Sequence, residues 1–298
     1  MGAEICVFQN CTPGVGNYAL RPPHYFGPVG AWTIRVNMRT SGQAPSVKSG
    51  ATVTRLYDDI DIYDITYENP DWSELINPTP FITEVISANT TGVTNMSKLF
   101  YNQQHLTHIA PMDTSLVTDM NNMFYQCYVL QEIPMMDTSL VTNMNNMFQN
   151  CYQLQELPML DTSRVEQLAF FMYACRSVQQ LPALDLSHVL YPDVAFHGCS
   201  ALTSLPQFDL SSCTSFQDMF SGCSSLTSIP AFTLPSTLQN RVCTAMFEEC
   251  RSVESGAMAL YNRLNPLRPK YYGRTFRNCG VNTTTGAAEL AQIPSSWK

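Results

Sequence analysis

The stretch DTSLVTNMNNMFQNCYQLQELPM, which runs from Asp137 to Met159, decides the fold because close copies of it stand on both sides. The copy before it is DTSLVTDMNNMFYQCYVLQEIPM from Asp113, and the copy after it is DTSRVEQLAFFMYACRSVQQLPA from Asp161. Each copy begins 24 residues after the previous one. A fixed period of this length is typical of repeat architectures, in which every unit buries its apolar face against its neighbours.

Two columns of apolar residues carry this period along the chain. The cysteine column consists of Cys127, Cys151, Cys175, Cys199, Cys223 and Cys250, and Cys279 follows it. The phenylalanine column consists of Phe100, Phe124, Phe148, Phe196, Phe220 and Phe247, and Phe276 follows it. Met172 stands at the one place where the second column lacks a Phe. We predict that both columns form structural ladders inside a stack of coils.

Each unit also contains signals for local structure. Apolar residues mostly three apart predict a short helical or 3₁₀ segment from Val141 to about Cys151. The following LQELPM from Leu154 predicts a short strand that pairs in parallel with its copies and ends at Pro158. An Asp-Thr-Ser sequence then opens the next unit, and its side-chain oxygens suit a turn or a helix N-cap. This turn or cap column consists of Asp113, Asp137, Asp161, Asp185 and Asp209.

Together these features predict an α/β repeat solenoid, similar to leucine-rich repeats. It should have about eight 24-residue coils, each with one short parallel strand and one short helix or 3₁₀ turn. Residues 1–88 lack the period, and their alternating segments from Trp32 and Ala51 predict a small β-rich N-terminal domain or arm. Residues 89–255 form the predicted solenoid. Residues 256–298 form a degenerate last coil and C-terminal cap, with a short helix expected from Ala257 to Leu264.

The charge balance limits the classes of partner. Charged residues make up 13% of the 298 residues, about half the usual share, and the formal net charge is −8. A nucleic-acid partner would need Lys and Arg to replace phosphate counterions, so none is expected. The sequence contains no run of 18 apolar residues and therefore predicts no membrane span. By contrast, the last segment, residues 256–298, holds six basic residues and one acidic residue, which suggests that it caps or docks something.

Candidate chemical groups all have a simpler structural explanation. The cysteine column lacks the close pairs of a metal site and predicts reduced, buried thiols, with disulfides between coils as the alternative. Cys6 and Cys11 form the remaining disulfide candidate. The pair His105 and His108 has no Cys or carboxylate at ligand spacing. The Asp column could bind calcium but fits turns better. The sequence therefore predicts no catalytic residue, no metal site, no cofactor and no enzymatic activity.

An acidic segment near the N-terminal end alternates charge with apolar residues. It runs DDIDIYD from Asp58 to Asp64. A solvated strand face is the first interpretation. The alternative is an exposed sheet edge used for oligomerisation or docking, in which like charges prevent indiscriminate pairing.

The repeated units resemble a known family. DTSLVTNMNNMFQNCYQLQELP from Asp137 and FSGCSSLTSIPAF from Phe220 are similar to the BspA-like leucine-rich repeats of bacterial surface proteins. The segments ENPDWSEL from Glu68 and VISANTTGVTNM from Val85 also resemble gut-bacterial and prophage-encoded members of this group. The resemblance implies a solenoid that binds protein or glycan at a surface and has no catalytic residues. Coils five and six lose the Met-x-x-Met-Phe pattern, and Pro192 could kink the coil there.

These observations lead to one functional expectation and one alternative. The start MGAEICVFQNC shows no basic n-region and no long apolar h-region, whereas adhesins of this kind usually carry an export signal. We therefore expect a non-enzymatic phage virion protein, of the capsid or tail decoration or fibre-like type. It would be assembled in the host cytoplasm, attached to the virion through residues 1–88, and bind host-surface or environmental protein or glycan. The alternative is a bacterial cell-surface adhesin or lipoprotein ectodomain, located extracellularly.

Overall fold

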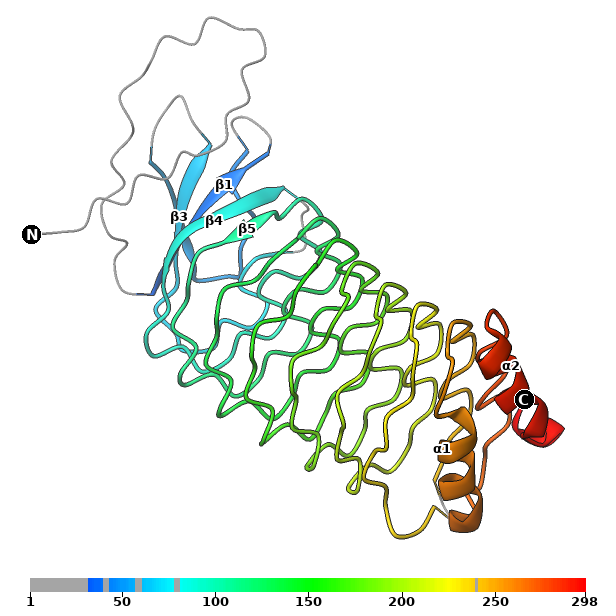
Figure 1. Cartoon of the computed structure of the whole chain (residues 1–298). Coiled ribbons are helices and arrows are strands. Elements are labelled where there is room, and N and C mark those ends of the chain that lie inside the picture. The colour runs from blue at the N-terminus through cyan, green and yellow to red at the C-terminus, as the bar shows by residue number, and fades with distance from the viewer. Residues whose placement is uncertain (1–31, 40–42, 57–60, 78–80, 239–240) are drawn as a thin grey trace, which may run out of the picture.

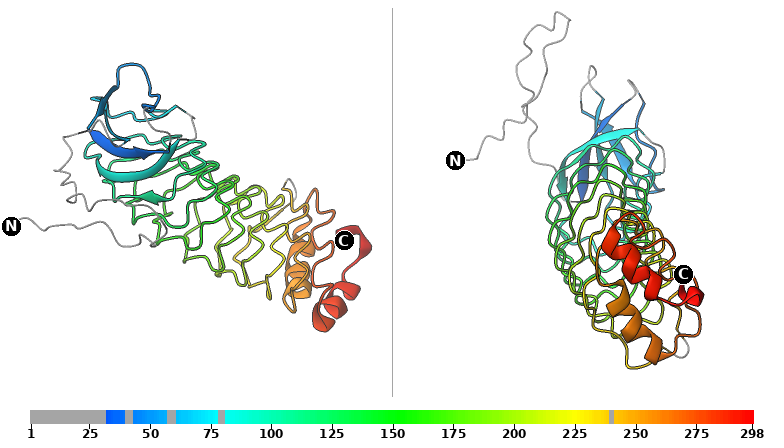
Figure 2. Two further views of the ribbon diagram at one scale, coloured as in Figure 1. Left: turned by 90° about the horizontal axis from the view of Figure 1, so that it is seen from above. Right: turned by 45° about the vertical axis from the view of Figure 1, so that its right-hand side comes forward.

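A computed structural model describes residues 32–39, 43–56, 61–77, 81–238 and 241–298. The chain forms a β-sheet at one end, winds through successive stacked coils, and finishes with two helices at the other end (Figure 1). Two further views show the same elongated arrangement (Figure 2). The predictions made for Cys6, Cys11, Asp58 and Asp59 lie outside the described residues.

The sheet has five strands in the order β2-β3-β1-β4-β5. Their bounds are Thr33–Met38 for β1, Thr52–Arg55 for β2, Ile62–Thr66 for β3, Ile82–Asn89 for β4 and His108–Ile109 for β5. β1 pairs antiparallel with β3 and β4, whereas β4 pairs in parallel with β5. The strands that were predicted from Trp32 and Ala51 are confirmed as β1, β2 and β3. β-Branched residues such as Ile34 and Val36 fill the core of this sheet.

Strand β4 joins the sheet to the coil stack. One of its edges pairs with β1, and the other pairs with β5 one coil later, where Glu84 lies beside His108. The coil pattern also begins before β4, because the N–H of Trp72 donates to the carbonyl of Asn95 at 2.8 Å. The boundary predicted at residue 88, between the N-terminal domain and the solenoid, therefore lies within β4, which belongs to both the sheet and the coil stack.

The acidic segment does not form a sheet edge, so the edge alternative is wrong for β3. This strand lies between β2 and β1, and β2 is the edge strand. Within β3, Asp64 accepts two hydrogen bonds from the buried Arg35, at 2.7 and 2.9 Å. Asp61 pairs with Arg55 at 3.0 Å. The described carboxylates thus stabilise pairing within the sheet instead of guarding its edge.

The segment from 141 to about 151, predicted to be a short helical or 3₁₀ segment, is a series of tight turns. Alternate N–H groups donate to the next coil, as Met144 does to Gln167 at 2.9 Å and Phe148 does to Phe171 at 2.8 Å. Between them, the N–H groups of Met147 and Gln149 donate to the carbonyls three residues back. Asn146 and Asn150 have φ values of 57° and 64°, in the left-handed region. A helix cannot form because every second N–H group donates to the neighbouring coil, and because two residues have left-handed backbone conformations.

The LQELPM segment from Leu154 is not a regular strand. The N–H of Gln155 donates to the carbonyl of Gln131 at 3.0 Å, but continuous pairing does not follow. Pro158 and its copies also have no N–H to donate, which leaves one position of each coil unable to pair. Single parallel pairings instead lie at the start of the turn segment, in the series Asp71, Asn95, Asp119, Asn143, Gln167 and Tyr191. The leucine-rich-repeat class of the whole solenoid stays a prediction.

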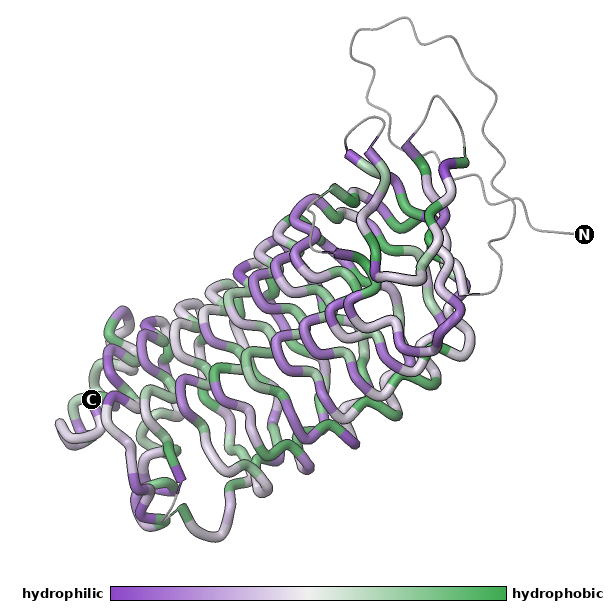
Figure 3. Tube along the Cα trace, turned by 180° about the vertical axis from the view of Figure 1, so that it is seen from behind, coloured by the Kyte–Doolittle hydropathy of each residue, from purple (hydrophilic) through white to green (hydrophobic). Residues whose placement is uncertain are grey.

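Phenylalanine rings stack through the core of the coils. Neighbouring rings of Phe100, Phe124 and Phe148 lie 5.7 and 5.5 Å apart and are nearly parallel. At the gap in the column, Met172 occupies the backbone position and Phe171 supplies the ring, 5.4 Å from Phe148. Figure 3 shows that residues of similar hydropathy recur at the same place in successive coils.

Pro192 removes one hydrogen bond without changing the pattern around it. Its position corresponds to that of Met144, whose N–H donates to the next coil. Proline lacks this donor. The next two donors of the same coil, Val194 and Phe196, bond to the following coil at 2.9 Å. The effect of Pro192 is therefore the loss of one hydrogen bond between coils, and the bonds of the next two donors are kept.

The C-terminal residues cover much of the last coil. Helix α1 spans Ala257–Leu264, as predicted, and is followed by the 3₁₀ helix Asn265–Leu267. Helix α2 spans Thr284–Gln292 and precedes the 3₁₀ helix Ser295–Trp297. The Thr283 hydroxyl accepts a bond from the N–H of Gly286 and so caps α2. Neither helix has the length and apolarity needed to cross a membrane, and no other helix of the described residues does.

Candidate recognition surface

The turn segments together form one broad surface, which we call the turn face. It comprises residues 95–104 and their copies at 119–128, 143–152, 167–176 and 191–200. Within each segment the side chains at the Met, Phe and Cys column positions are buried, while most of the residues between them are partly or fully exposed. The tight turns cause this alternation, so that the outward residues repeat at the coil spacing of about 4.8 Å.

Tyrosine rings form partly exposed pairs on the turn face. Tyr101 stacks on Tyr125 with 4.7 Å between ring centroids, and Tyr128 stacks on Tyr152 at 5.0 Å. The Arg176 guanidinium lies 4.9 Å from the Tyr152 ring centroid and extends the second pair by one coil. Stacking covers the ring faces and leaves the ring edges and hydroxyl groups for a ligand.

An aromatic cluster continues the turn face towards the C-terminal end. Tyr173 stacks on the His197 ring at 5.0 Å, and Phe170 lies 6.0 Å from Tyr173. Burial lowers the pKa of His197, although Asp218 and Glu248 oppose this effect. The cluster is therefore an uncharged aromatic surface at neutral pH.

Amide side chains lie between these rings and bond from coil to coil. The Asn145 amide donates to the Gln167 side-chain oxygen at 3.0 Å and accepts from the N–H of Ala169 at 2.7 Å. Such groups can both donate and accept hydrogen bonds. The turn face thus offers hydroxyls, amides and rings with little charge.

A shallow hollow adjoins the turn face next to Arg176. Its lining includes Gln155, Glu156, Gln179 and Gln180 from two successive coils. Arg176 links the hollow to the tyrosine pairs, because its guanidinium lies over Tyr152 while the residue also lines the hollow. The two features form one continuous candidate surface for a ligand that spans several coils.

The Asp column lies outside this surface and forms turns. The Asp113, Asp137 and Asp161 carboxylates each accept bonds from the N–H and the hydroxyl of the serine two residues later. Asp185 and Asp209 each accept from the N–H of the corresponding serine at 2.9 Å. The serine hydrogen bonds hold the pKa of Asp137 below its usual value, against repulsion from the neighbouring Asp residues. These carboxylates are already engaged within their own turns.

The cysteine column is buried and bonded to the backbone. The Cys151 thiol donates to the carbonyl of Phe124 at 3.1 Å, and Cys127, Cys175, Cys199, Cys223 and Cys250 make the same contact one coil back. The nine cysteines of the described residues are free thiols. Burial raises the pKa of the Cys199 thiol to about 12, so it is a poor nucleophile at neutral pH.

The thiol column predicts a loss of stability in alkaline solution. The folded chain holds the Cys199 proton up to about pH 12, whereas an unfolded thiol releases it near its ordinary value of 9.0. The stabilisation from the neutral thiols is therefore complete below pH 9 and decreases as the pH rises from there towards 12. Urea midpoints measured across this range should fall. A midpoint that stays constant above pH 9 would contradict the prediction.

The two histidines His105 and His108 contact different residues. Arg39 contacts the His105 ring, and burial followed by the Arg39 charge lowers the pKa of His105. His108 lies instead near Glu132, with 3.9 Å between the nearest nitrogen and oxygen. Within the described ranges, no group of three or more His, Cys, Asp or Glu side chains could hold a metal ion.

The sequence analysis did not identify the tyrosine pairs or a second turn column. In that column the side chains of Asn95, Asp119 and Asn143 each accept from the N–H two residues later. The 24-residue period applied to Tyr and Asn would have found both, since Tyr101 and Tyr125, like Asn95 and Asp119, are one period apart.

A family model supports the assignment of this chain. The family described as "Mycoplasma protein of unknown function, DUF285" matches residues 74–184 and 155–260, which together cover more than half of the chain. The chain belongs to the DUF285 family. The first match begins at Glu74, in the first coil bonded to the stack, and the second ends at residue 260, so the DUF285 region covers the coils except the last one. No curated protein and no solved structure matches the chain.

The DUF285 match is consistent with the predicted BspA-like repeats. The finer resemblance to gut-bacterial and prophage-encoded members stays a prediction. The family description gives no ligand or activity, so the function is argued from the surface itself.

Proposed function

We propose that this chain is a non-enzymatic recognition protein that binds protein or glycan through its turn face. The observation that carries this proposal is the repetition of exposed Tyr pairs and bonded amides at the coil spacing. Groups that could perform catalysis are engaged elsewhere: the Asp carboxylates in turns and the thiols in backbone contacts. A repeating surface suits a ligand that is itself extended.

The chemistry of the turn face favours a ligand with little charge. Tyrosine hydroxyls and amides match the hydroxyls of a glycan or the backbone of an exposed peptide. Tyr is also enriched at interfaces, because it combines apolar area with a hydrogen-bonding group. These properties support both ligand classes.

For the location, we favour a phage virion, with residues 1–88 attached to the particle. The free thiols of the cysteine column, which begins at Cys127, support folding in a reducing cytoplasm, since disulfides are favoured in extracellular compartments. The alternative is a bacterial cell-surface adhesin or lipoprotein ectodomain. Antibody labelling of purified phage particles and of intact bacterial cells separates the two proposals. Labelled particles would support the virion protein. Labelled cells without labelled particles would contradict it and support the adhesin.

Substitution of one tyrosine pair tests the recognition proposal. The double variant Tyr128→Ala and Tyr152→Ala removes two exposed rings and the stacking partner of Arg176. Binding to a glycan array and to a panel of surface proteins should weaken about tenfold or more, a typical loss for an interface anchor. The same array and panel, probed with the unaltered chain, identify the ligand.

The matched control is Leu116→Ala, an exposed side chain outside the turn face. It should bind as the unaltered chain does. Circular dichroism checks that both variants fold. If the Tyr variant folds and keeps its affinity for every ligand found, the turn face is not the recognition surface.

A further inference from the structure

Most backbone hydrogen bonds of the turn face run in one direction along the stack. In a coil up to four N–H groups donate to carbonyls of the following coil, and the coil with Pro192 has three such donors. Near the C-terminal end the donors are Cys243, Ala245, Phe247 and Glu249, and their acceptors are Tyr271, Gly273, Thr275 and Arg277. The last coil has the corresponding donors at Tyr272, Arg274, Phe276 and Asn278, and in the described residues α2 and the 3₁₀ helix Ser295–Trp297 follow it in place of another coil.

The C-terminal segment uses only part of this row of donors. The N–H of Phe276 donates to the carbonyl of Trp297 at 2.9 Å, so the 3₁₀ helix Ser295–Trp297 already occupies one place in the row. In the described part of the chain, the N–H groups of Tyr272 and Arg274 have no protein partner. They are two residues apart, as alternate donors of a strand edge are.

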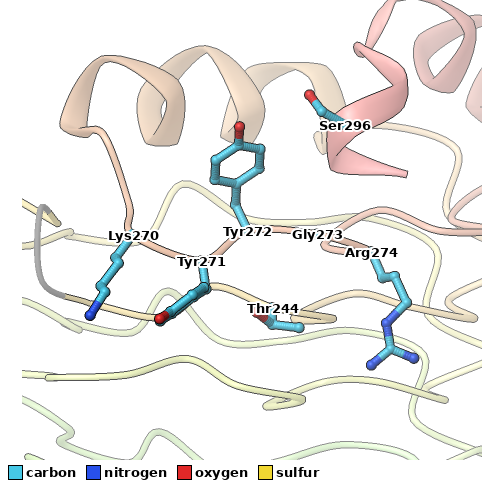
Figure 4. Close-up of a pocket in the computed structure, with 7 residues that line it drawn as sticks. All are labelled: Thr244, Lys270, Tyr271, Tyr272, Gly273, Arg274 and Ser296. Atoms are coloured by element: carbon cyan, nitrogen blue, oxygen red, sulfur yellow. The ribbon is translucent and has the colours of Figure 1, made fainter.

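The space around these two donors is open. No atom lies within 4 Å of the place where a Cβ on Gly273 would be. Tyr272, Gly273, Arg274 and Ser296 contribute to the lining of a shallow hollow here. Figure 4 shows Tyr272 and Ser296 on one side of this segment, and Lys270, Tyr271 and Arg274 on the other. The segment is thus accessible along its length.

The charge of this end is opposite to that of the stack. Residues 256–298 contain six basic residues and one acidic residue. Of the cations closest to the open donors, the Lys270 ammonium lies over the Tyr271 ring at 5.1 Å. The Arg274 guanidinium lies 3.4 Å from Glu248 and is half exposed. Donors without partners and nearby cations both favour an acceptor-rich, acidic partner.

The opposite end of the stack is closed, which excludes simple growth by identical copies. The N–H of Lys48 donates to the carbonyl of Leu75 at 2.8 Å, and the Lys48 ammonium donates to the carbonyl of Ser73 at 2.9 Å. These carbonyls would be the acceptors for the last coil of another copy. Since Lys48 already occupies them, head-to-tail stacking cannot complete the open end.

We propose that the open edge from Lys270 to Arg274 binds an extended acidic segment of a partner protein. Alternate carbonyls of that segment accept from the N–H groups of Tyr272 and Arg274 and so continue the stack. Acidic side chains of the segment lie near Lys270 and Arg274. This site is separate from the turn face and does not depend on the ligand proposed there.

Binding of short peptides to the full chain tests this proposal. The probes are a fluorescent peptide of alternating Glu and Thr, the same peptide with Lys in place of Glu, and polygalacturonate as an acidic polysaccharide. The Glu-Thr peptide should bind at least about tenfold more tightly than either of the others. The double variant Lys270→Glu and Arg274→Asn should lose this binding, and Asn is chosen because φ at 274 is 62°. The matched control Arg164→Glu, an exposed basic residue in the middle of the stack, should keep it.

Amide signals distinguish strand addition from attraction by charge alone. In a chain labelled with ¹⁵N at Tyr and Arg, hydrogen exchange of the Tyr272 and Arg274 amides should slow when the Glu-Thr peptide binds. The variant Gly273→Trp, whose side chain enters open space, should fold and block the peptide. Equal binding of polygalacturonate, unchanged exchange at both amides, or full binding by the double variant would each overturn the proposal.

Discussion

Replacing Phe148 by Ala is expected to lower the free energy of unfolding by about 3–5 kcal/mol. The ring is fully buried and packs between Phe124 at 5.5 Å and Phe171 at 5.4 Å. Its removal leaves a cavity in the middle of the column, where the neighbouring coils hold their positions through backbone hydrogen bonds. Urea denaturation followed by circular dichroism measures the loss.

The control is Tyr152→Ala, which removes a partly exposed aromatic ring from the same coil. That change should cost less, because Tyr152 is partly exposed whereas Phe148 is fully buried. If both variants unfold at the same urea concentration, the phenylalanine column contributes less than its burial implies. A broadened transition in the Phe148 variant would further indicate that the stack unfolds in parts.

Replacing Gly256 by Ala is expected to destabilise the chain by about 2–5 kcal/mol. Two effects combine: a left-handed conformation costs a non-glycine residue roughly 1–2 kcal/mol, and overpacking costs about 1–3 kcal/mol. Gly256 has a φ of 97°, and an added Cβ would lie within van der Waals overlap of the Ile229 carbonyl oxygen, at 2.2 Å. This glycine fixes the start of α1 against the preceding coil. Thermal denaturation measures the change.

Gly273→Ala is the matched control, because it makes the same substitution at another glycine in the C-terminal part of the chain. Its Cβ meets no atom within 4 Å, and its φ lies outside the left-handed region. The substitution should be neutral or slightly stabilising, since Ala restricts the unfolded chain more than Gly does. A similar loss in both variants would show that the contact with Ile229 is not responsible.

The period allowed much of the core to be predicted without a structure. The Cys and Phe columns are buried at the positions where the sequence placed them, because residues one period apart occupy the same environment in a stack. The helix from Ala257 to Leu264 was also predictable, from its local pattern. The open edge at Tyr272 was not, since it depends on which donors the C-terminal segment leaves without partners.

The error over residues 141–151 has a specific cause. A spacing of three between apolar residues fits both a helix and a series of tight turns, and no local signal separates them. The stack decides, because each coil offers its neighbour a row of carbonyl acceptors that takes every second N–H. It even imposes left-handed φ values on Phe170 and Val194, 57° and 63°, which such residues resist. Tertiary pairing therefore overrides local preference here.

By itself, the sequence determined that this protein repeats, which residues fill its core, and that its outer residues are mostly uncharged. These properties follow from the spacing and chemistry of side chains, which are read directly from the chain. Only the tertiary structure decided the direction of the backbone hydrogen bonds, the outward position of the tyrosine pairs, and the open edge at the C-terminal end. Those features arise from contacts between coils, and a single coil has no neighbour to set them.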